Sequence, residues 1–206
     1  MLTAHKSNTM ETRNALRKRK RAARNQLTEK QQLHASKQLA KLFFRSGLFW
    51  RSKHVALYIA SDGELDPLPI AETCWRLGKS VYLPVLHETG DNRLRFALWQ
   101  PSTRLVPNRY GIPEPHPWRC LPPWALNLVL LPLVAFDPQG GRMGMGGGFY
   151  DKTFAFTRRS PLRPKLFGLA HECQRVDQLP VESWDIPLDG IFSDRQLYLP
   201  ANNGLQ

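Results

Sequence analysis

The chain has 206 residues, of which 42% are hydrophobic and 22% charged, and its formal net charge is +12. This length and composition fit one domain, or at most two small ones, and exclude a chain that is disordered throughout. No apolar run approaches the roughly 18–20 residues that a membrane span needs. The three cysteines (Cys74, Cys120 and Cys173) are too far apart for paired metal ligands, and their odd number argues against a disulfide scaffold. We therefore expect a reduced, cytoplasmic protein.

The excess positive charge lies at the N-terminal end of the chain. Residues 1–53 carry fourteen Lys and Arg against only Glu11 and Glu29, whereas residues 54–206 carry fifteen basic and fifteen acidic residues. The densest basic run is 17–21. Such a run is typical of a solvated helix face, of a contact with a phosphate or another polyanion, or of a nucleic-acid surface, and the sequence leaves all three interpretations open.

The first elements predicted along the chain are helices. Residues 1–10 are expected to form a tail, and residues 11–26 a basic helix. A second helix is predicted to begin at a capping box formed by Thr28 and Gln31 and to end at Gly47.

Strands then alternate with helices. Residues 54–60 form a nearly continuous apolar run, which is typical of a strand buried on both faces. A helix over 67–77 and a strand over 80–86 complete a βαβ unit, which predicts a parallel sheet with a right-handed crossover. Residues 94–99 predict a further strand, antiparallel and at an edge of the sheet.

The second half of the chain returns to the sheet after an irregular connection. Residues 100–125 hold seven prolines, whose fixed φ angles stiffen the segment. A central strand, a Gly-rich loop, a helix and three further strands are predicted over 126–135, 137–148, 149–158, 165–170, 190–193 and 196–199. This alternation predicts a three-layer α/β fold in a single domain over residues 11–200, with a C-terminal tail over 201–206.

The Gly-rich loop carries the clearest functional signal. Six of the 14 glycines fall within 140–148, and glycine at this density costs conformational entropy on folding, so it requires a local reason. A loop between a strand and a helix presents unpaired N–H groups that suit a phosphate, and Arg142 can add a charged hydrogen bond. The spacing fits neither a P-loop nor the dinucleotide fingerprint. We expect an anion site; the alternative is a loop that only turns tightly against a neighbouring strand.

Several segments together resemble the 5-formyltetrahydrofolate cyclo-ligase family. The specific part is Arg-x-Gly-x-Gly-x-Gly-Phe-Tyr-Asp at 142–151, supported by Ser61–Asp66, Leu83–Val85 and Trp184–Pro187. The likeness runs from about residue 13 to residue 199. It implies an α/β/α sandwich with a mostly parallel central sheet, like that of ribose-phosphate isomerases and CoA-transferases. It also implies a cytoplasmic, Mg-ATP-dependent enzyme that cyclises 5-formyltetrahydrofolate to 5,10-methenyltetrahydrofolate.

The resemblance also assigns site residues by position. The ATP-binding residues would be Arg13, Asn14, Ala15, Leu16, Arg17, Arg142, Met143, Gly144, Met145, Gly146, Gly147, Gly148, Phe149 and Tyr150. The folate would contact Ile59, Glu64, Tyr110 and the loop from Met145 to Phe149. Magnesium would be bound by Asp151 and Asp189. Many members carry a Lys at the position of Gly147 and a basic residue at the position of Met145. In this chain the arginines would therefore have to supply the positive charge that neutralises the phosphates.

Other interpretations stay open beside this one. Asp151 also suits a helix cap and Asp189 a turn, while His171, Glu172 and Cys173 are interpreted as structural. We expect Lys20 to be solvated, on a different helix face from Arg17. The alternatives in function are a basic nucleic-acid-binding protein and a sugar-phosphate isomerase or acyltransferase on the same fold. The expected partners are small-molecule substrates: ATP, and 5-formyltetrahydrofolate with or without a polyglutamate tail. We expect no membrane or nucleic-acid partner, and we expect the protein to be a monomer.

Overall fold

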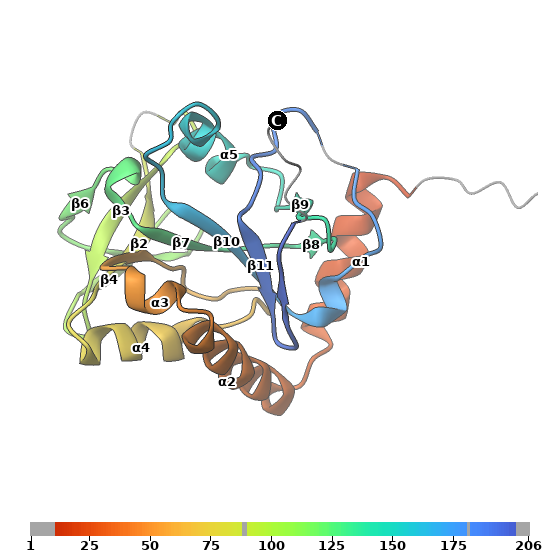
Figure 1. Cartoon of the computed structure of the whole chain (residues 1–206), viewed down its shortest axis with the longest axis horizontal. Helices are drawn as coiled ribbons and strands as arrows, with labels where there is room; N and C mark the ends of the chain where they lie inside the picture. The colour runs from red at the N-terminus through yellow and green to blue at the C-terminus, as the bar shows by residue number, and fades with distance from the viewer. Residues whose placement is uncertain (1–10, 88–89, 181, 201–206) are drawn as a thin grey trace, which may run out of the picture.

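A computed structural model describes residues 11–87, 90–180 and 182–200 of the chain, so the expected tails over 1–10 and 201–206 lie outside the described residues. The described residues form a central eight-stranded sheet (Figure 1). In spatial order its strands are β12 (Leu197–Tyr198), β11 (Gly190–Ser193), β10 (Lys165–Ala170), β7 (Leu128–Pro132), β1 (His54–Ala56), β2 (Ser80–Leu86), β3 (Leu94–Trp99) and β6 (Cys120–Leu121). The strands from β11 to β2 are parallel to one another, whereas β12 and β3 run antiparallel to their neighbours.

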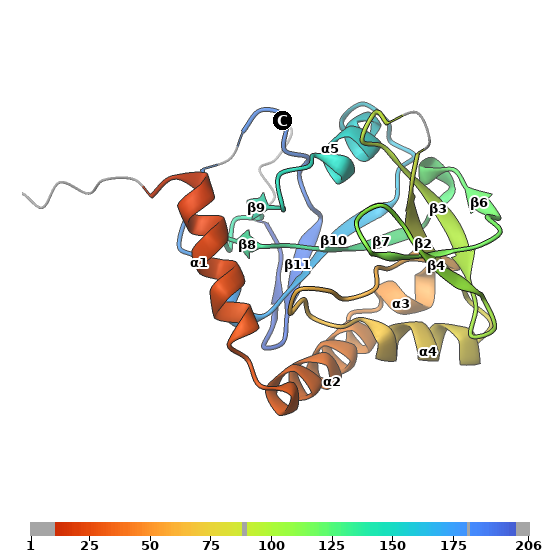
Figure 2. The same ribbon diagram turned by 180° about the vertical axis from the view of Figure 1, so that it is seen from behind.

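Helices cover both faces of this sheet. On one face lie α2 (Glu29–Arg45), α3 (Leu48–Arg51) and α4 (Leu68–Arg76), and on the other lies α5 (Phe149–Phe154), as Figures 1 and 2 show. Successive strand residues point to opposite faces, so Leu128 and Leu130 pack on the α2 side while Val129 and Leu131 pack on the α5 side. The apolar runs are continuous because both faces are buried, which confirms the predicted three-layer fold with a mostly parallel sheet.

The basic helix α1 (Arg13–Asn25) lies at the side of this sandwich rather than in its layers (Figure 2). Thr12 caps its first turn by accepting a hydrogen bond from the Ala15 N–H. It packs against the 3₁₀ turn η3 (Glu172–Gln174) and against β8 (Ala135–Phe136), which pairs with β9 (Arg142–Met143). The Thr28–Gln31 capping box that opens α2 is confirmed.

Three segments that precede the Gly-rich loop differ from the sequence-based expectation. β1 ends at Ala56 rather than Ala60, because after Leu57 donates to the Tyr82 carbonyl the chain leaves the ladder. β3 is antiparallel as expected but does not lie at the edge, since β6 pairs beyond it. Residues 100–125 are not irregular: besides β6 and the 3₁₀ turn η1 (Pro123–Ala125) they form a hairpin of β4 (Leu105–Pro107) and β5 (Pro113–Pro115), where a two-stranded ribbon tolerates proline.

The helix predicted over 149–158 is divided. The α-helix α5 covers its first part, and the 3₁₀ turn η2 (Ala155–Arg158) covers the rest. The expected Gly-rich loop over 137–148 likewise contains the short strand β9, which anchors the loop to β8. A loop tied down in this way can hold its glycines in one conformation.

Candidate active site

The carboxyl ends of β1, β2 and β7 open into a cleft of about 540 Å³. Its walls come from α1, from the loops after these strands, from the hairpin of β4 and β5, and from the Gly-rich loop with the start of α5. Parallel strands end at a common edge of their sheet, and open α/β sheets bind their ligands there. The cleft therefore lies where the fold favours a binding site.

Most residues assigned by the resemblance line this cleft. They are Arg13, Arg17, Ile59, Glu64, Tyr110, Arg142, Gly144, Met145, Gly146, Gly147, Gly148, Phe149, Tyr150 and Asp151. Those that do not line it are Asn14, Ala15, Leu16, Met143 and Asp189. Leu16 and Met143 are buried with Ala135 and Leu179 in a small apolar cluster, so their side chains fix α1 to β8 and β9 instead of facing a ligand.

Backbone conformation explains two glycines of the loop. Gly146 has a φ of +102°, a region that residues with a side chain rarely adopt. A Cβ on Gly147 would lie 2.7 Å from the Phe149 ring. Arg17 lies over this loop, because its Nε donates to the Gly144 carbonyl at 3.0 Å. The bare backbone and a guanidinium thus form one surface suited to a phosphate.

The two arginines of α1 are held at the cleft by neighbouring groups. Arg13 donates from Nη1 to the Pro180 carbonyl at 2.5 Å and to Asp185 at 3.2 Å. Arg17 donates from Nη1 to Asn14 Oδ1 at 2.7 Å, so Asn14 orients the guanidinium although it does not line the cleft itself. Each guanidinium has five N–H donors and keeps some of them for a ligand.

Arg142 is a buried cation at the cleft. Its side chain is 4% exposed and forms an ion pair with Asp151, whose Oδ1 also accepts the Ile186 N–H at 3.0 Å. Among the described residues, Arg142 Nε has no hydrogen-bond partner even though it is buried. Leaving a buried donor unpaired is costly, and because Arg142 lines the cleft, a ligand bound there can supply the acceptor.

Glu64 brings a carboxylate to the same cleft. Its Oε2 accepts the Ser61 N–H at 3.2 Å, and its Oε1 lies 3.8 Å from Nη2 of Arg24. Burial raises the pKa of Glu64, and the charge of Arg24 opposes that rise. Burial also raises the pKa of the Tyr150 phenol, with Glu64 adding to the effect, so Tyr150 is a neutral hydroxyl at physiological pH.

Part of the cleft wall was missed from the sequence. Glu114 accepts the Leu86 N–H at 2.9 Å and Nδ2 of Asn108 at 2.7 Å, which places all three at the cleft. No sequence signal marked Glu114 or Asn108, because residues 100–125 show no periodicity. Tyr110, which was expected, is largely exposed and meets the Phe149 ring at 83°, with the centroids 6.2 Å apart.

The expectation that Lys20 is solvated is wrong. Lys20 is buried, and its Nζ donates to the carbonyls of Cys173 at 2.9 Å and Arg175 at 2.5 Å. Burial lowers the pKa of this ammonium. Of the basic residues in 17–24, Lys18 alone makes no hydrogen bond or ion pair within the described part of the chain. The basic run is therefore largely committed to internal contacts, which weakens the nucleic-acid interpretation.

Asp189 does not line the cleft with Asp151. It precedes β11 and therefore lies at the amino edge of the sheet, opposite the cleft. Its carboxylate pairs with Arg163 at 2.7 Å and Lys165 at 3.0 Å and accepts the Leu166 N–H. The structure thus corrects the expectation of two carboxylates around one metal ion. The described residues contain no group of three or more His, Cys, Asp or Glu side chains that could hold a metal ion.

Residues 171–173 fit the structural role expected of them. β10 ends before His171, so these residues lie in the turn η3 rather than on a strand. His171 is buried, and burial lowers the pKa of its imidazole. Glu172 accepts a hydrogen bond from the Tyr198 hydroxyl at 2.6 Å. None of the three lines the cleft.

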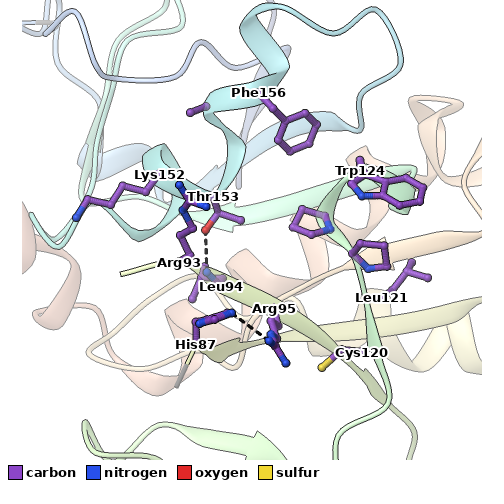
Figure 3. A pocket seen from close by; sticks show the side chains of 13 residues that line it. His87, Arg93, Leu94, Arg95, Cys120, Leu121, Trp124, Lys152, Thr153 and Phe156 are labelled. Atoms are coloured by element: carbon purple, nitrogen blue, oxygen red, sulfur yellow. Dashed lines mark hydrogen bonds between the residues drawn. The ribbon is translucent and has the colours of Figure 1, made fainter. Parts of the chain in front are cut away.

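A second cavity of about 550 Å³ lies between β3, β6 and the segment from α5 to η2 (Figure 3). Arg93, Arg95 and Lys152 line it together with Trp124 and Phe156. Leu94 contacts both cavities, but no residue that the resemblance assigned to a site lines this one. Of these two cavities, only the first cleft is therefore lined by expected site residues.

These features define the class of protein. A three-layer α/β fold with a cationic, glycine-lined cleft at its carboxyl edge is typical of enzymes that bind an anionic ligand. A sequence model of the 5-formyltetrahydrofolate cyclo-ligase family matches residues 9–194. The chain belongs to this family and is a ligase enzyme.

Individual relatives agree with this assignment. The chain is 41% identical over 185 residues to the 5-formyltetrahydrofolate cyclo-ligase of Escherichia coli K12, covering 89% of this chain and 98% of that protein. It is 42% identical over 144 residues to the enzyme of the same name from Haemophilus influenzae, covering 69% of this chain and 76% of that one. The structure of 5,10-methenyltetrahydrofolate synthetase from Aquifex aeolicus matches with a TM-score of 0.79 and 27% identity, over 94% of this chain and 95% of that chain.

The remaining alternatives find no support among these relatives. Those described are named as cyclo-ligases or as a methenyltetrahydrofolate synthetase, and none is named as a nucleic-acid-binding protein, an isomerase or an acyltransferase. As for membranes, no helix within the described ranges is both long and apolar enough to cross one.

Proposed function

We propose that this protein cyclises 5-formyltetrahydrofolate to 5,10-methenyltetrahydrofolate while ATP is converted to ADP and phosphate. The observation that carries the proposal is the cleft itself. It brings the unpaired Nε of Arg142 and the bare loop around Gly146 to the same cavity as Glu64 and Tyr110. Phosphate groups suit the first pair, and a flat heterocycle with N–H groups suits the second.

The chemistry explains why ATP is needed. A formamide carbon is a weak electrophile, and its oxygen is a poor leaving group. Transfer of the γ-phosphoryl group to the formyl oxygen turns that oxygen into a phosphate leaving group. N10 then attacks the formyl carbon and loses its proton, the C–O bond breaks and the five-membered ring closes. Such a sequence requires positioning and neutralised charge rather than a protein nucleophile.

The residues of the cleft can serve these needs. Arg13, Arg17 and Arg142 are positioned to neutralise the phosphates, without the lysine that many members of the family carry at the position of Gly147. Burial strengthens such charge–charge contacts because the local dielectric is low. Glu64, in contact with Ser61, is suited to accept hydrogen bonds from the folate.

Magnesium is proposed to enter with ATP. Mg²⁺ is commonly bound through one or two carboxylates together with substrate phosphates and water. Asp151 fits the protein's share, since both of its contacts within the described residues use Oδ1 and leave Oδ2 available at the cleft. Asp189 lies at the other edge of the sheet and is not part of this proposal. When bound, Mg²⁺ would neutralise phosphate charge.

We further propose that one cyclo-ligase domain over residues 11–200 works as a monomer in the cytoplasm. The bounds of the domain are supported by the family match, which covers residues 9–194.

A coupled assay tests the function. Purified protein is incubated with 5-formyltetrahydrofolate and Mg-ATP, and methenyltetrahydrofolate and ADP are measured together. We expect both products in equal amounts and neither without ATP. Conversion without ATP would favour an isomerase-like reaction, and the absence of product would refute the proposal. Affinity for RNA or DNA that falls steeply with salt would instead support the nucleic-acid alternative.

A further inference from the structure

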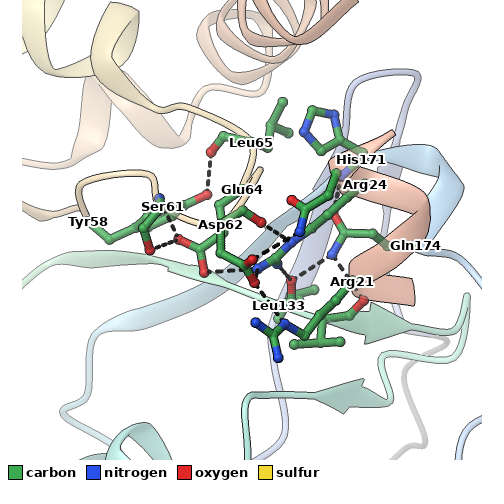
Figure 4. Close-up of polar contacts among 12 residues, drawn as sticks. Arg21, Arg24, Tyr58, Ser61, Asp62, Glu64, Leu65, Leu133, His171 and Gln174 are labelled. Carbon is green, nitrogen blue, oxygen red and sulfur yellow. Dashed lines mark hydrogen bonds and ion pairs between the residues drawn. The ribbon is translucent and has the colours of Figure 1, made fainter. Parts of the chain in front are cut away.

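Among the residues that the structure describes, Arg24 is the most deeply buried charged side chain, and Figure 4 shows its surroundings. Its side chain is 0% exposed. Nε donates to the Asp62 carbonyl at 2.7 Å, Nη1 to the Leu133 carbonyl at 3.1 Å, and Nη2 to Asp62 Oδ2 at 2.8 Å. Nη2 also lies 3.8 Å from Oε1 of Glu64. One guanidinium therefore joins α1, the chain after β7 and the loop that carries Glu64.

The loop from Ser61 to Glu64 fits tightly against the end of α1. Asp62 and Gly63 have φ values of +50° and +72°, so the chain reverses here and the Glu64 N–H donates to the Ser61 carbonyl at 2.9 Å. A Cβ on Gly63 would lie 2.2 Å from Asn25 Oδ1. Only glycine allows this approach, and it brings Glu64 within reach of Arg24.

The groups around Glu64 decide its charge. Tyr58 from the end of β1 and Tyr150 from α5 face it as neutral phenols, because burial raises the pKa of each. Asp62 is a second carboxylate in the same loop. His171, beside Arg24 in Figure 4, adds no positive charge at neutral pH, since burial lowers its pKa. Arg24 is thus the cation whose charge acts most strongly on Glu64, while Arg142 lines the same cleft.

The carboxylates of Asp62 and Glu64 differ in their hydrogen-bond partners other than Arg24. Asp62 also accepts hydrogen bonds from Arg21 at 2.8 Å and from Asn25 at 3.0 Å, and these contacts with Arg24 keep its pKa well below the usual range. In the described part of the chain, the further hydrogen-bond partners of Glu64 are only the Ser61 N–H and hydroxyl. Without Arg24, Asp62 would stay ionised, and Glu64 would be the group that takes up a proton.

We propose that Arg24 is a positioning residue for the reaction: its buried guanidinium fixes the loop from Ser61 to Glu64 and supplies the positive charge that lets Glu64 meet the folate as a carboxylate. The proposal rests on the proposed function, because it assigns Glu64 to the substrate. Arg24 touches neither substrate in this scheme and acts through Glu64.

The pH profile of kcat/KM for 5-formyltetrahydrofolate tests this role. In Arg24→Gln we expect the acid limb to move upward by roughly 1–3 pH units, the usual effect of an opposite charge at this distance. Arg24→Lys should restore most of the profile. Arg21→Gln is the matched control, because it removes a partner of the same Asp62 oxygen without facing Glu64, and its profile should stay within a few tenths of a unit of the parent's. A loss in Arg24→Gln that is equal at every pH would overturn the proposal.

A second variant has the opposite expected sign. Asp62→Asn removes the competing anion, so the charge of Arg24 acts on Glu64 alone and the acid limb should move to lower pH. This variant retains Arg24 and keeps the test decisive if Arg24→Gln does not fold. An unchanged or upward-shifted limb in Asp62→Asn would contradict the proposal.

A direct titration separates this inference from the proposed function. The carboxyl carbon of Glu64 is followed by NMR in ¹³C-labelled protein and assigned with Glu64→Gln. Its midpoint should rise in Arg24→Gln and fall in Asp62→Asn whether or not the protein turns over folate. If the parent forms no methenyltetrahydrofolate, the proposed function fails while this titration still judges the role of Arg24. Equal midpoints in the parent and Arg24→Gln would overturn it.

Discussion

Single residues in the cleft combine burial with unsatisfied polar groups. Arg142 keeps its guanidinium out of water and pairs one side with Asp151, yet its Nε has no acceptor among the described residues. Buried donors in folded proteins are nearly always paired, so we expect a bound ligand to supply the missing acceptor.

Gly146 provides a test at this scale. Gly146→Val places a β-branched side chain at a φ of +102° and beside the Arg17 guanidinium, whose Cζ would lie 3.7 Å from the new Cβ. We expect ATP binding measured by calorimetry to be lost while the fold is retained. Gly47→Val is the control, because it places the same kind of strain (φ +74°) outside the cleft. Equal ATP affinity in Gly146→Val and the parent would contradict this prediction.

Asp151 provides a second residue-scale test. Asp151→Asn keeps an acceptor for the Ile186 N–H but leaves the charge of Arg142 without its partner. We expect a lower melting temperature and a clearly higher magnesium concentration for half-maximal rate. Asp189→Asn should also lower the melting temperature, since Asp189 pairs with Arg163, but should leave the magnesium requirement unchanged. If both variants show the parent's requirement, Asp151 has only a structural role.

At the scale of an element, α1 uses its faces for different purposes. Leu16, Lys20 and Arg24 are spaced by four residues and form the buried face that packs on η3 and the chain after β7. Arg13 and Arg17, also four residues apart, face the cleft. Lys18 is exposed. The same residue type therefore serves for docking, for ligand contact or for solvation, according to its place on the helix.

Substitutions on these faces should separate binding from stability. Arg17→Ala should raise the KM for ATP by about ten-fold or more, because a charged hydrogen bond contributes roughly 1.5–3 kcal/mol. Lys18→Ala, the exposed control, should change it by less than about two-fold. Similar effects of both on KM would mean that α1 acts as a diffuse positive charge.

Lys20→Ala should behave differently from both. It leaves the carbonyls of Cys173 and Arg175 without their shared donor, which should lower the free energy of unfolding by about 1–3 kcal/mol in a urea titration. An unfolding midpoint equal to that of Lys18→Ala would show that these contacts do not stabilise α1.

At the scale of the whole molecule, the net charge of +12 does not describe a uniform surface. The basic excess is confined to the first quarter of the sequence, and much of it is neutralised by contacts to loops far along the chain, such as that of Arg13 with Asp185 and of Arg21 with Asp62. Stability should therefore respond to pH through a few internal groups rather than through general repulsion.

The free energy of unfolding should fall in two stages as pH is lowered. Burial depresses the pKa of His171 in the folded state, so below about pH 6.5 the unfolded chain binds the proton more readily and stability declines. Arg21 and its neighbours lower the pKa of Asp62. At Asp189, burial acts to raise the pKa, but the contacts with Arg163, Leu166 and Lys165 together outweigh burial and lower it. The stability from both carboxylates is complete above about pH 4 and is lost below it.

Urea titrations across pH test the first stage. His171→Gln should abolish the decline between pH 7 and pH 5, whose slope cannot exceed about 1.4 kcal/mol per pH unit for one proton. His34→Gln, on the exposed side of α2, should leave it unchanged. A persistent decline in His171→Gln would assign this stage to another group.

Local patterns were enough to predict most elements and part of the site. Helix starts at Thr12 and Thr28 depend on hydrogen bonds within four residues, and the alternation of strands and helices depends on periodicity over a few turns. The Gly-rich loop was recognisable because its glycines and Arg142 are contiguous. Short strands such as β4 and β5 were missed, because their pairing partner rather than their own pattern makes them strands.

Tertiary structure alone decided which charged side chains face the cleft. Lys20 was expected to be solvated, but it is buried by carbonyls that lie 153 and 155 positions further along the chain. Asp151 lies in the first turn of α5 and Asp189 directly precedes β11, yet the fold places them at opposite edges of one sheet. Sequence by itself determined which residue types are present and which local structures they favour. Their partners depend on long-range packing, because a charge is stabilised by whatever the fold places beside it.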